Sequence, residues 1–177
     1  MTERILVTGA DGYIGTALMK ELLIQTPQQR SVMGVDNGDR FRWVQQVGGF
    51  SLTQYERMNY FNANLQDLAN VANILNYFKP TIIIHLASQP SGPYSEISYQ
   101  HRIGTQINNL TILMNLLGTI HELGLDTGFV VATTTGIAGA PGGPIEEAHS
   151  PNIAGSTYHV SRGFDSLFES DMSEQKR

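Results

Sequence analysis

Near its start the chain carries the stretch "RILVTGADGYIG", which runs from Arg4 to Gly15. An apolar run over residues 5–7 precedes the first of three glycines, Gly9, Gly12 and Gly15, which are spaced three residues apart. An apolar run that ends at a glycine is typical of a buried strand, and the residues after the glycines have helical spacing. Such a junction can hold a phosphate, because the bare backbone approaches the ligand and the helix amides face its charge. The alternative is a tight strand-to-helix turn with no ligand.

The next expected strand, over residues 31–36, ends in an acid. Asp36 follows Gly9 by 27 residues, slightly more than the roughly 20 residues of the usual dinucleotide fingerprint. A carboxylate at this place accepts hydrogen bonds from the adenosine ribose and repels a 2′-phosphate, which favours NAD over NADP. The alternative is that Asp36 only begins an Asp-Asn-Gly turn.

Further along, expected strands and helices alternate. We predict strands over 60–63, 81–87 and 128–133, helices over 13–26, 65–78, 94–123 and 156–168, and a short helix over 42–47. This alternation predicts an α/β fold of Rossmann type, a doubly wound parallel sheet with helices on both faces. Because ligands bind at the carboxyl ends of such strands, Gly9, Asp36, Ala87 and Thr134 should line one crevice.

Composition sets the broad class. The 177 residues are 41% hydrophobic and 15% charged, with a net charge of -5, which indicates one soluble globular domain over 1–177 and argues against nucleic acid as a partner. There is no cysteine, and the five histidines lack metal-binding spacing, so we expect neither disulfides nor a metal. No apolar run approaches the ~20 residues of a membrane span, and the start does not resemble a signal peptide. We therefore expect a cytoplasmic protein without membrane partners.

Several motifs in order resemble the extended branch of the short-chain dehydrogenase/reductase superfamily, the NAD-dependent epimerase/dehydratase family. They are TGADGYIG at 8–15, HLASQ at 85–89, NNLTILMNLL at 108–117, ATTTGIAG at 132–139 and the stretch at 144–162. Within this family the chain most resembles the UDP-sulfoquinovose synthases. The cues are QPSGPYS at 89–95, TQINN at 105–109, a threonine at 134 and YHVSRGFDS at 158–166.

The resemblance implies a catalytic set of Thr134, Tyr158 and Arg162. Tyrosine, with an ordinary pKa near 10, is a poor base unless a nearby cation favours the tyrosinate. Arg162 lies four residues after Tyr158, so both share one helix face, but the family has lysine there, and arginine is not its equivalent. We expect cofactor binding to survive this change and proton transfer to be slowed or lost. The alternatives are that Tyr158 is an ordinary helix residue and Thr134 an ordinary strand-end residue.

The resemblance also implies ligand contacts. For NAD the expected residues are Gly9, Asp11, Gly12, Tyr13, Ile14, Gly15, Asp36, Asn37, Asn64, Leu65, Leu86, Ala87, Gln89, Asn109, Tyr158 and Arg162. For the substrate they are Ser91, Tyr94, Thr134 and Thr135. Besides Arg162, three positions depart from the family: Asn64 replaces an aspartate, Ala138 replaces a tyrosine, and Pro90 replaces a basic residue of the UDP-sulfoquinovose synthases, which puts sulfite handling in doubt.

The implied function is NAD-dependent oxidation of a nucleotide sugar, a UDP-hexose, at C4. Extended members are about twice as long as this chain, so the resemblance implies that the C-terminal substrate domain is largely absent. It also implies a homodimer through helices at 100–123 and 156–168. Two alternatives stay open: a non-catalytic NAD-binding module or partner subunit of a split enzyme, and a reductase of small carbonyl compounds.

Overall fold

The computed structural model of the chain describes residues 3–25, 30–39, 59–138 and 156–164. It divides into two compact units. Unit 1 comprises residues 1–87 and 114–130, and unit 2 comprises residues 88–113 and 131–177. The short helix expected over 42–47 and the last residues of the helix expected over 156–168 lie outside the described residues.

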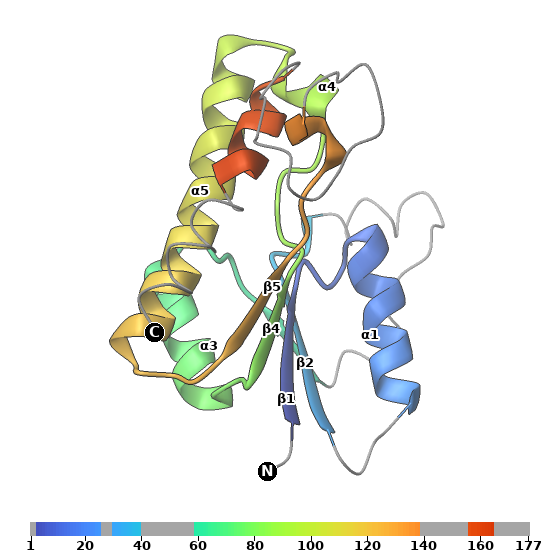
Figure 1. Cartoon of the computed structure of the whole chain (residues 1–177), viewed down its shortest axis with the longest axis vertical. Coiled ribbons are helices and arrows are strands. Elements are labelled where there is room, and N and C mark those ends of the chain that lie inside the picture. Colours follow the sequence, from blue (N-terminus) through green and yellow to red (C-terminus); the bar gives the residue numbers. More distant parts are fainter. Residues whose placement is uncertain (1–2, 26–29, 40–58, 139–155, 165–177) are drawn as a thin grey trace. The chain divides into compact units, whose positions relative to one another are not determined.

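Five strands form one sheet (Figure 1). They are β1 (Glu3–Thr8), β2 (Arg30–Asp36), β3 (Tyr60–Asn62), β4 (Ile82–His85) and β5 (Gly128–Val131). Their order in the sheet is β3-β2-β1-β4-β5, and β1 pairs in parallel with both β2 and β4, as β2 does with β3. This is the order of a Rossmann-type sheet. The predicted α/β fold is therefore confirmed.

The helices follow the predicted order with shifted ends. They are α1 (Tyr13–Gln25), α3 (Leu68–Phe78), α4 (Gly92–Ser95), α5 (Tyr99–Glu122), the 3-10 turn η2 (Thr135–Ala138) and a helix over 157–164. The helix expected from residue 65 begins at Leu68, because the Asp67 side chain accepts the Ala69 N–H at 2.9 Å and caps it. The long helix expected over 94–123 is divided into α4 and α5.

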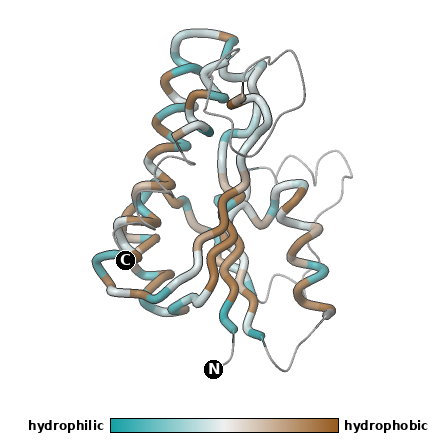
Figure 2. Tube along the Cα trace, in the orientation of Figure 1, coloured by the Kyte–Doolittle hydropathy of each residue, from teal (hydrophilic) through white to brown (hydrophobic). Residues whose placement is uncertain are grey.

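Within unit 1, α1 lies on one face of the sheet and α3 on the other (Figure 1). Alternate residues of β1 supply the two faces: Ile5 and Val7 pack with Met19 of α1, whereas Leu6 is fully buried beside Ile83 in register. Figure 2 shows the apolar residues concentrated along these central strands. Burial on both faces is what a central parallel strand requires.

Hydroxyl groups tie the sheet together at the end where β4 and β5 begin. Thr81 Oγ1 accepts the Arg4 N–H at 2.9 Å and donates to the Arg4 carbonyl at 3.3 Å. Thr127 Oγ1 donates to the Pro80 carbonyl at 2.8 Å. Just before these residues Lys79 ends α3 in the left-handed conformation, with φ at 46°. This end of the strands lies opposite the end at which the glycines follow β1.

Candidate functional site

In unit 1, packing requires two of the three glycines of the motif, Gly9 and Gly15. Gly9 has φ at 70°, and a Cβ there would lie 2.7 Å from the Ala87 nitrogen. A Cβ on Gly15 would collide with the Gly9 carbonyl oxygen, whereas on Gly12 it would meet, among the described residues, only that same oxygen, at 3.0 Å. Gly9 and Gly15 therefore allow the turn itself, and Gly12 leaves bare backbone beside the start of α1. The residues fit a phosphate group approaching the backbone closely.

The first turn of α1 adds donors to this loop. The amides of Tyr13, Ile14 and Gly15 begin the helix and have no partner inside it. The side chains of Tyr13 and Ile14 are 77% and 62% exposed, so the loop that bears them is reached from solvent. Unpaired amides at the positive end of a helix dipole are suited to a diphosphate.

Asp36 closes β2 beside the glycine loop, as the sequence predicts. Its Oδ2 accepts the Asp11 N–H at 3.2 Å and its Oδ1 accepts the Gly38 N–H at 2.9 Å. Burial raises the pKa of the Asp36 carboxyl, and the charges of Asp11 and Asp39 raise it further, against the two N–H bonds. A carboxylate with two oxygens retains acceptor capacity for a ribose diol. Asp36 therefore both braces the loop and presents an acceptor.

Two side chains that sequence analysis did not select hold this part of the site. Tyr60 donates its hydroxyl to Asp11 Oδ2 at 2.7 Å. The fully buried Thr8 hydroxyl lies 2.8 Å from His85 Nδ1 and accepts the N–H groups of Leu86 and Ala87 at 3.1 Å each. Because these two amides occupy its acceptor sites, Thr8 donates to the imidazole. The strand-end residues 86–87 are thus fixed against the glycine loop. Thr8 is the first residue of the glycine motif, and its position in that motif was the only indication of its role in the sequence.

The other predicted cofactor residues of unit 1 lie in two turns. Asn37 and Asp39 bond to each other, with the Asn37 side-chain amide donating to Asp39 Oδ2 at 2.8 Å. Asn64 is exposed and its Oδ1 accepts the Gln66 N–H at 3.0 Å, whereas the Leu65 side chain is only 4% exposed. Their roles as adenosine contacts stay predictions. His85 is 1% exposed and bonded to Thr8.

In unit 2, Thr134 lies directly before η2. Its Oγ1 accepts the Gly136 N–H at 3.2 Å, so its own hydrogen is available to a ligand oxygen. A Cβ on Gly136 would collide with the His159 ring, which places this imidazole directly against the turn. The ring centroids of His159 and Tyr158 are 5.4 Å apart. Thr135 is exposed at the start of the turn.

The helix over 157–164 carries Tyr158 and Arg162. Tyr158 is half-buried and Arg162 is 3% exposed. The Tyr158 carbonyl accepts the Ser161 hydroxyl at 2.8 Å, and the same oxygen of Ser161 accepts the Asn109 side-chain amide at 2.8 Å. The Arg162 carbonyl accepts the Thr133 hydroxyl at 3.4 Å. The catalytic candidates of this helix are therefore tied to α5 and to the segment before Thr134.

The side-chain amide of Asn109 is bonded to other protein groups. Its Oδ1 accepts the Gln89 N–H at 2.7 Å and the Asn108 side-chain amide at 2.9 Å, and its Nδ2 donates to the Gln89 carbonyl at 3.3 Å as well as to Ser161. These bonds use the whole capacity of the amide. Asn109 and Gln89 are thus loop anchors in this structure, and their contact with NAD stays a prediction.

The predicted substrate residues Ser91 and Tyr94 belong to the start of α4. Ser91 Oγ accepts the Tyr94 N–H at 3.1 Å and caps this short helix. The Tyr94 side chain is 44% exposed. Its ring lies edge-on to that of His101, with the two ring centroids 4.6 Å apart. Whether they contact a substrate stays a prediction.

The expected crevice is partly described. Gly9, Asp36 and Ala87 come together in unit 1 through the contacts above, whereas Thr134 belongs to unit 2, so its place in that crevice stays a prediction. In the residues that the structure describes, no group of three or more histidine, aspartate or glutamate side chains is arranged to hold a metal ion. None of the described helices is both long and apolar enough to cross a membrane.

Comparison with known proteins gives one family. Residues 5–162 match the NAD dependent epimerase/dehydratase family. The chain is 29% identical to the UDP-sulfoquinovose synthase of Sulfolobus acidocaldarius, with 93% of this chain and 49% of that protein aligned. It is also 29% identical to the chloroplastic UDP-sulfoquinovose synthase of Spinacia oleracea, with 93% and 39% aligned. A solved UDP-glucose 4-epimerase from Thermus thermophilus, in complex with NAD, superposes with a TM-score of 0.78 at 26% identity, over 97% of this chain and 51% of that one. The chain therefore spans about half the length, or less, of these relatives.

Proposed function

Because the chain belongs to the NAD dependent epimerase/dehydratase family, we propose that it binds NAD and takes part in oxidising a nucleotide sugar, a UDP-hexose, at C4. Membership confirms the resemblance predicted from the motifs, and the family is one of NAD-dependent enzymes. The nucleotide-sugar substrate is supported by the UDP-sulfoquinovose synthases and the UDP-glucose 4-epimerase to which the chain is similar. The observation that carries the cofactor assignment is the glycine cradle, where Gly12 leaves the backbone bare beside the α1 amides.

The residues of unit 1 are assigned to the cofactor. The amides of Tyr13, Ile14 and Gly15 would hold the diphosphate, and Asp36 would accept the hydroxyls of the adenosine ribose. When bound, NAD supplies the acceptor for the hydride that leaves the sugar. The braces on this part, from Tyr60 to Asp11 and from Thr8 to the 86–87 backbone, would hold the loop ready before the ligand arrives.

The residues of unit 2 are assigned to the proton. As the C4–H bond breaks, the C4 hydroxyl gives its proton to the Tyr158 phenolate, and a 4-keto sugar results. Thr134 would donate its hydroxyl hydrogen to the C4 oxygen, since its acceptor side is engaged by the Gly136 N–H. Arg162 is a buried cation one helical turn after Tyr158, and it would act on the tyrosine side chain because residues four apart share one helix face. This Thr-Tyr-Arg set is the specific part of the proposal.

The direct test is to mix the purified chain, loaded with NAD, with UDP-glucose and to record reduced-nicotinamide absorbance in a single turnover. We expect absorbance to rise with UDP-glucose and not with UDP alone. NAD that binds tightly without any such rise would overturn the catalytic proposal and leave the alternative, a non-catalytic NAD-binding module or a partner subunit of a split enzyme.

One observation favours that alternative. Arg162 stands where the resemblance places lysine, and its guanidinium is larger and planar, with a fixed donor geometry unlike that of an ammonium. We expect Arg162→Lys to increase the hydride-transfer rate while the affinity for NAD changes little. If the lysine variant is no faster than the wild type, the substitution is not what limits the chemistry.

The exposed apolar side chains of unit 2 support a homodimer, in which the partner is a second copy of the chain. On α5 the apolar side chains Tyr99, Ile103 and Ile107 are 72%, 40% and 55% exposed and recur every four residues, so they form one stripe. Phe164, on the helix over 157–164, is 38% exposed. We expect Ile107→Glu to shift the sedimentation of the chain from dimer to monomer. A wild-type chain that sediments as a monomer at high concentration would contradict the dimer.

A further inference from the structure

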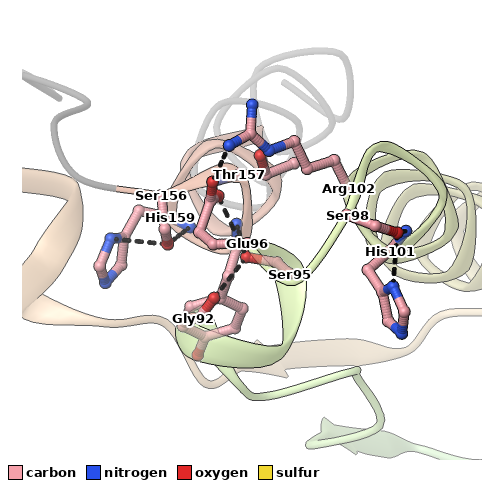
Figure 3. A network of polar contacts seen from close by, with 10 residues as sticks. Gly92, Ser95, Glu96, Ser98, His101, Arg102, Ser156, Thr157 and His159 are labelled. Atoms are coloured by element: carbon pink, nitrogen blue, oxygen red, sulfur yellow. Dashed lines mark hydrogen bonds and ion pairs between the residues drawn. The ribbon is translucent and has the colours of Figure 1, made fainter.

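The first amides of the helix over 157–164 are paired by side chains from distant parts of the sequence. Glu96 Oε1 accepts the Thr157 N–H at 2.8 Å (Figure 3). Ser95 Oγ accepts the Tyr158 N–H at 3.3 Å. The third amide, of His159, is paired locally by Ser156 Oγ at 3.4 Å. A helix start leaves its first N–H groups unpaired within the helix. Here two of these three donors depend on Ser95, the last residue of α4, and on Glu96, which follows it.

Glu96 is itself held in place. Arg102, in the first turn of α5, lies with Nη2 2.7 Å from Glu96 Oε2 (Figure 3). The bond from the Thr157 N–H, followed by that from the Thr157 hydroxyl, keeps the pKa of the Glu96 carboxyl below its usual range, and the Arg102 charge lowers it further. The side chain is thus a carboxylate at neutral pH. A negative charge also suits the positive end of the helix dipole.

Tyr158 lies in the turn that this carboxylate holds. Its N–H is bonded to Ser95 and its carbonyl to Ser161, which is bonded in turn to Asn109. The peptide groups on both sides of Tyr158 are therefore fixed, and Arg162 follows one turn later on the same face. We propose that Glu96, held by Arg102, is a positioning residue that sets the orientation of Tyr158 by capping its helix. This inference rests on the proposed role of Tyr158 as the base.

A plain surface ion pair is the competing explanation. The Glu96 and Arg102 side chains are 33% and 53% exposed, and exposed pairs contribute little to stability by themselves. What distinguishes the proposed role is the acceptor oxygen that Glu96 presents to a backbone amide. Glutamine retains such an oxygen without the charge, whereas alanine retains neither. A positioning role therefore predicts that Glu96→Gln, which keeps the acceptor oxygen but loses the ion pair with Arg102, lies between the wild type and Glu96→Ala and closer to the wild type.

The experiment compares Glu96→Ala, Glu96→Gln and a matched control, Glu122→Gln, which changes an exposed carboxylate on α5. For each variant of the 177-residue chain we would measure single-turnover hydride transfer at saturating NAD over a series of UDP-glucose concentrations, and the ¹⁹F spectrum of 3-fluorotyrosine-labelled protein. The Tyr158 resonance is identified by its absence from Tyr158→Phe. In Glu96→Ala we expect a rate lower by at least about 10-fold, with little change in KM, and a displaced resonance. Glu96→Gln should restore most of both, with a displacement no larger than that of Arg102→Gln, and the control should leave both unchanged.

The outcomes separate this inference from the proposed function. If the wild type transfers no hydride, the chemistry is wrong, and the ¹⁹F resonance alone decides the positioning role. A folded Glu96→Ala variant with the wild-type resonance and rate would overturn the positioning role of Glu96. If Glu96→Ala does not fold, Arg102→Gln takes its place, because it loosens the carboxylate without removing it. That variant should move the resonance in the same direction by a smaller amount, and an unmoved resonance would overturn the proposal.

Discussion

The glycine loop of unit 1 and the helix over 157–164 of unit 2 carry the two halves of the proposed chemistry, and they are held by different means. The loop owes its shape to the absence of side chains, since a Cβ at Gly9 or Gly15 would strike backbone atoms. The helix owes its placement to side chains that are present, Glu96, Ser95 and Asn109, each about 50 to 60 residues from its contact. Adding volume should therefore damage the first region, whereas removing a polar group should damage the second.

The largest effect is expected in the second region. Tyr158→Phe removes the proposed base and leaves the helix contacts, which use the backbone of Tyr158, in place. We expect hydride transfer to fall by about 10²- to 10⁴-fold, with an affinity for NAD within a few-fold of the wild type. Single-turnover absorbance and calorimetry measure the two quantities. A phenylalanine variant that retains the wild-type rate would remove Tyr158 from the mechanism.

In the first region the test is an added methyl group. Gly9→Ala forces a Cβ against the Ala87 backbone at a positive φ, so we expect it to lower the free energy of unfolding by about 3 kcal/mol and to weaken NAD binding by at least about 10-fold. The matched control is Gly104→Ala in α5, where, apart from the adjacent residues and the backbone of the helix itself, no described atom lies within 4 Å of the added Cβ. It should instead stabilise the chain by about 0.5–1 kcal/mol. Urea denaturation compares the two, and equal effects would contradict the packing argument.

The hydrogen bonds of the Thr8 hydroxyl in unit 1 test whether the first region also depends on side chains. Thr8→Val keeps the shape but leaves two backbone amides and the His85 ring without the hydroxyl. We expect a loss of about 2 kcal/mol in the free energy of unfolding. Thr105→Val is the control, because its buried hydroxyl has no hydrogen-bond partner among the described residues. That change should be neutral or stabilising, and a Thr8 variant as stable as its control would show that the brace is unimportant.

The smallest effect concerns pH. Burial, with the charges of Asp11 and Asp39, raises the pKa of the Asp36 carboxyl above its ordinary value of 3.8. The protonated Asp36 side chain therefore contributes to the free energy of unfolding at pH values below its ordinary pKa. This contribution is lost as the pH rises through the raised pKa of the folded state. The ribose needs the carboxylate, so affinity for NAD should increase several-fold over the same rise in pH. Calorimetry across that range measures it. A flat wild-type profile, or an unchanged slope in Asp36→Asn, would contradict this assignment.

Sequence patterns were most informative where the structure depends on local rules. The strand before Gly9, the acid that ends β2 and the buried run of β4 are found where the residues predicted them, because periodicity and glycine act over a few residues. Element ends were less predictable. The start of α3 moved to Leu68, since the cap formed by Asp67 outweighs the apolar residue at 65.

Long-range side-chain bonds account for what the sequence did not indicate. Nothing near Glu96 shows that it pairs with an amide at residue 157, and the roles of Thr8 and Tyr60 appear only when distant strands meet. Asn109 was selected for its place in a family motif, but its amide is consumed by Gln89, Asn108 and Ser161. The motif selected this residue, but its bonds to Gln89, Asn108 and Ser161 could not be inferred from the motif, and its contact with NAD stays a prediction.

The hydroxyl ties around Thr81 and Thr127 have a practical consequence. They reinforce unit 1 at the strand ends most remote from the glycines, so thermal tolerance can be engineered there while the ligand-facing loops keep their native sequence. Lys79 is the natural first position, since its left-handed backbone suits glycine. Replacing it by glycine should raise the melting temperature slightly, by relieving up to about 1 kcal/mol of strain.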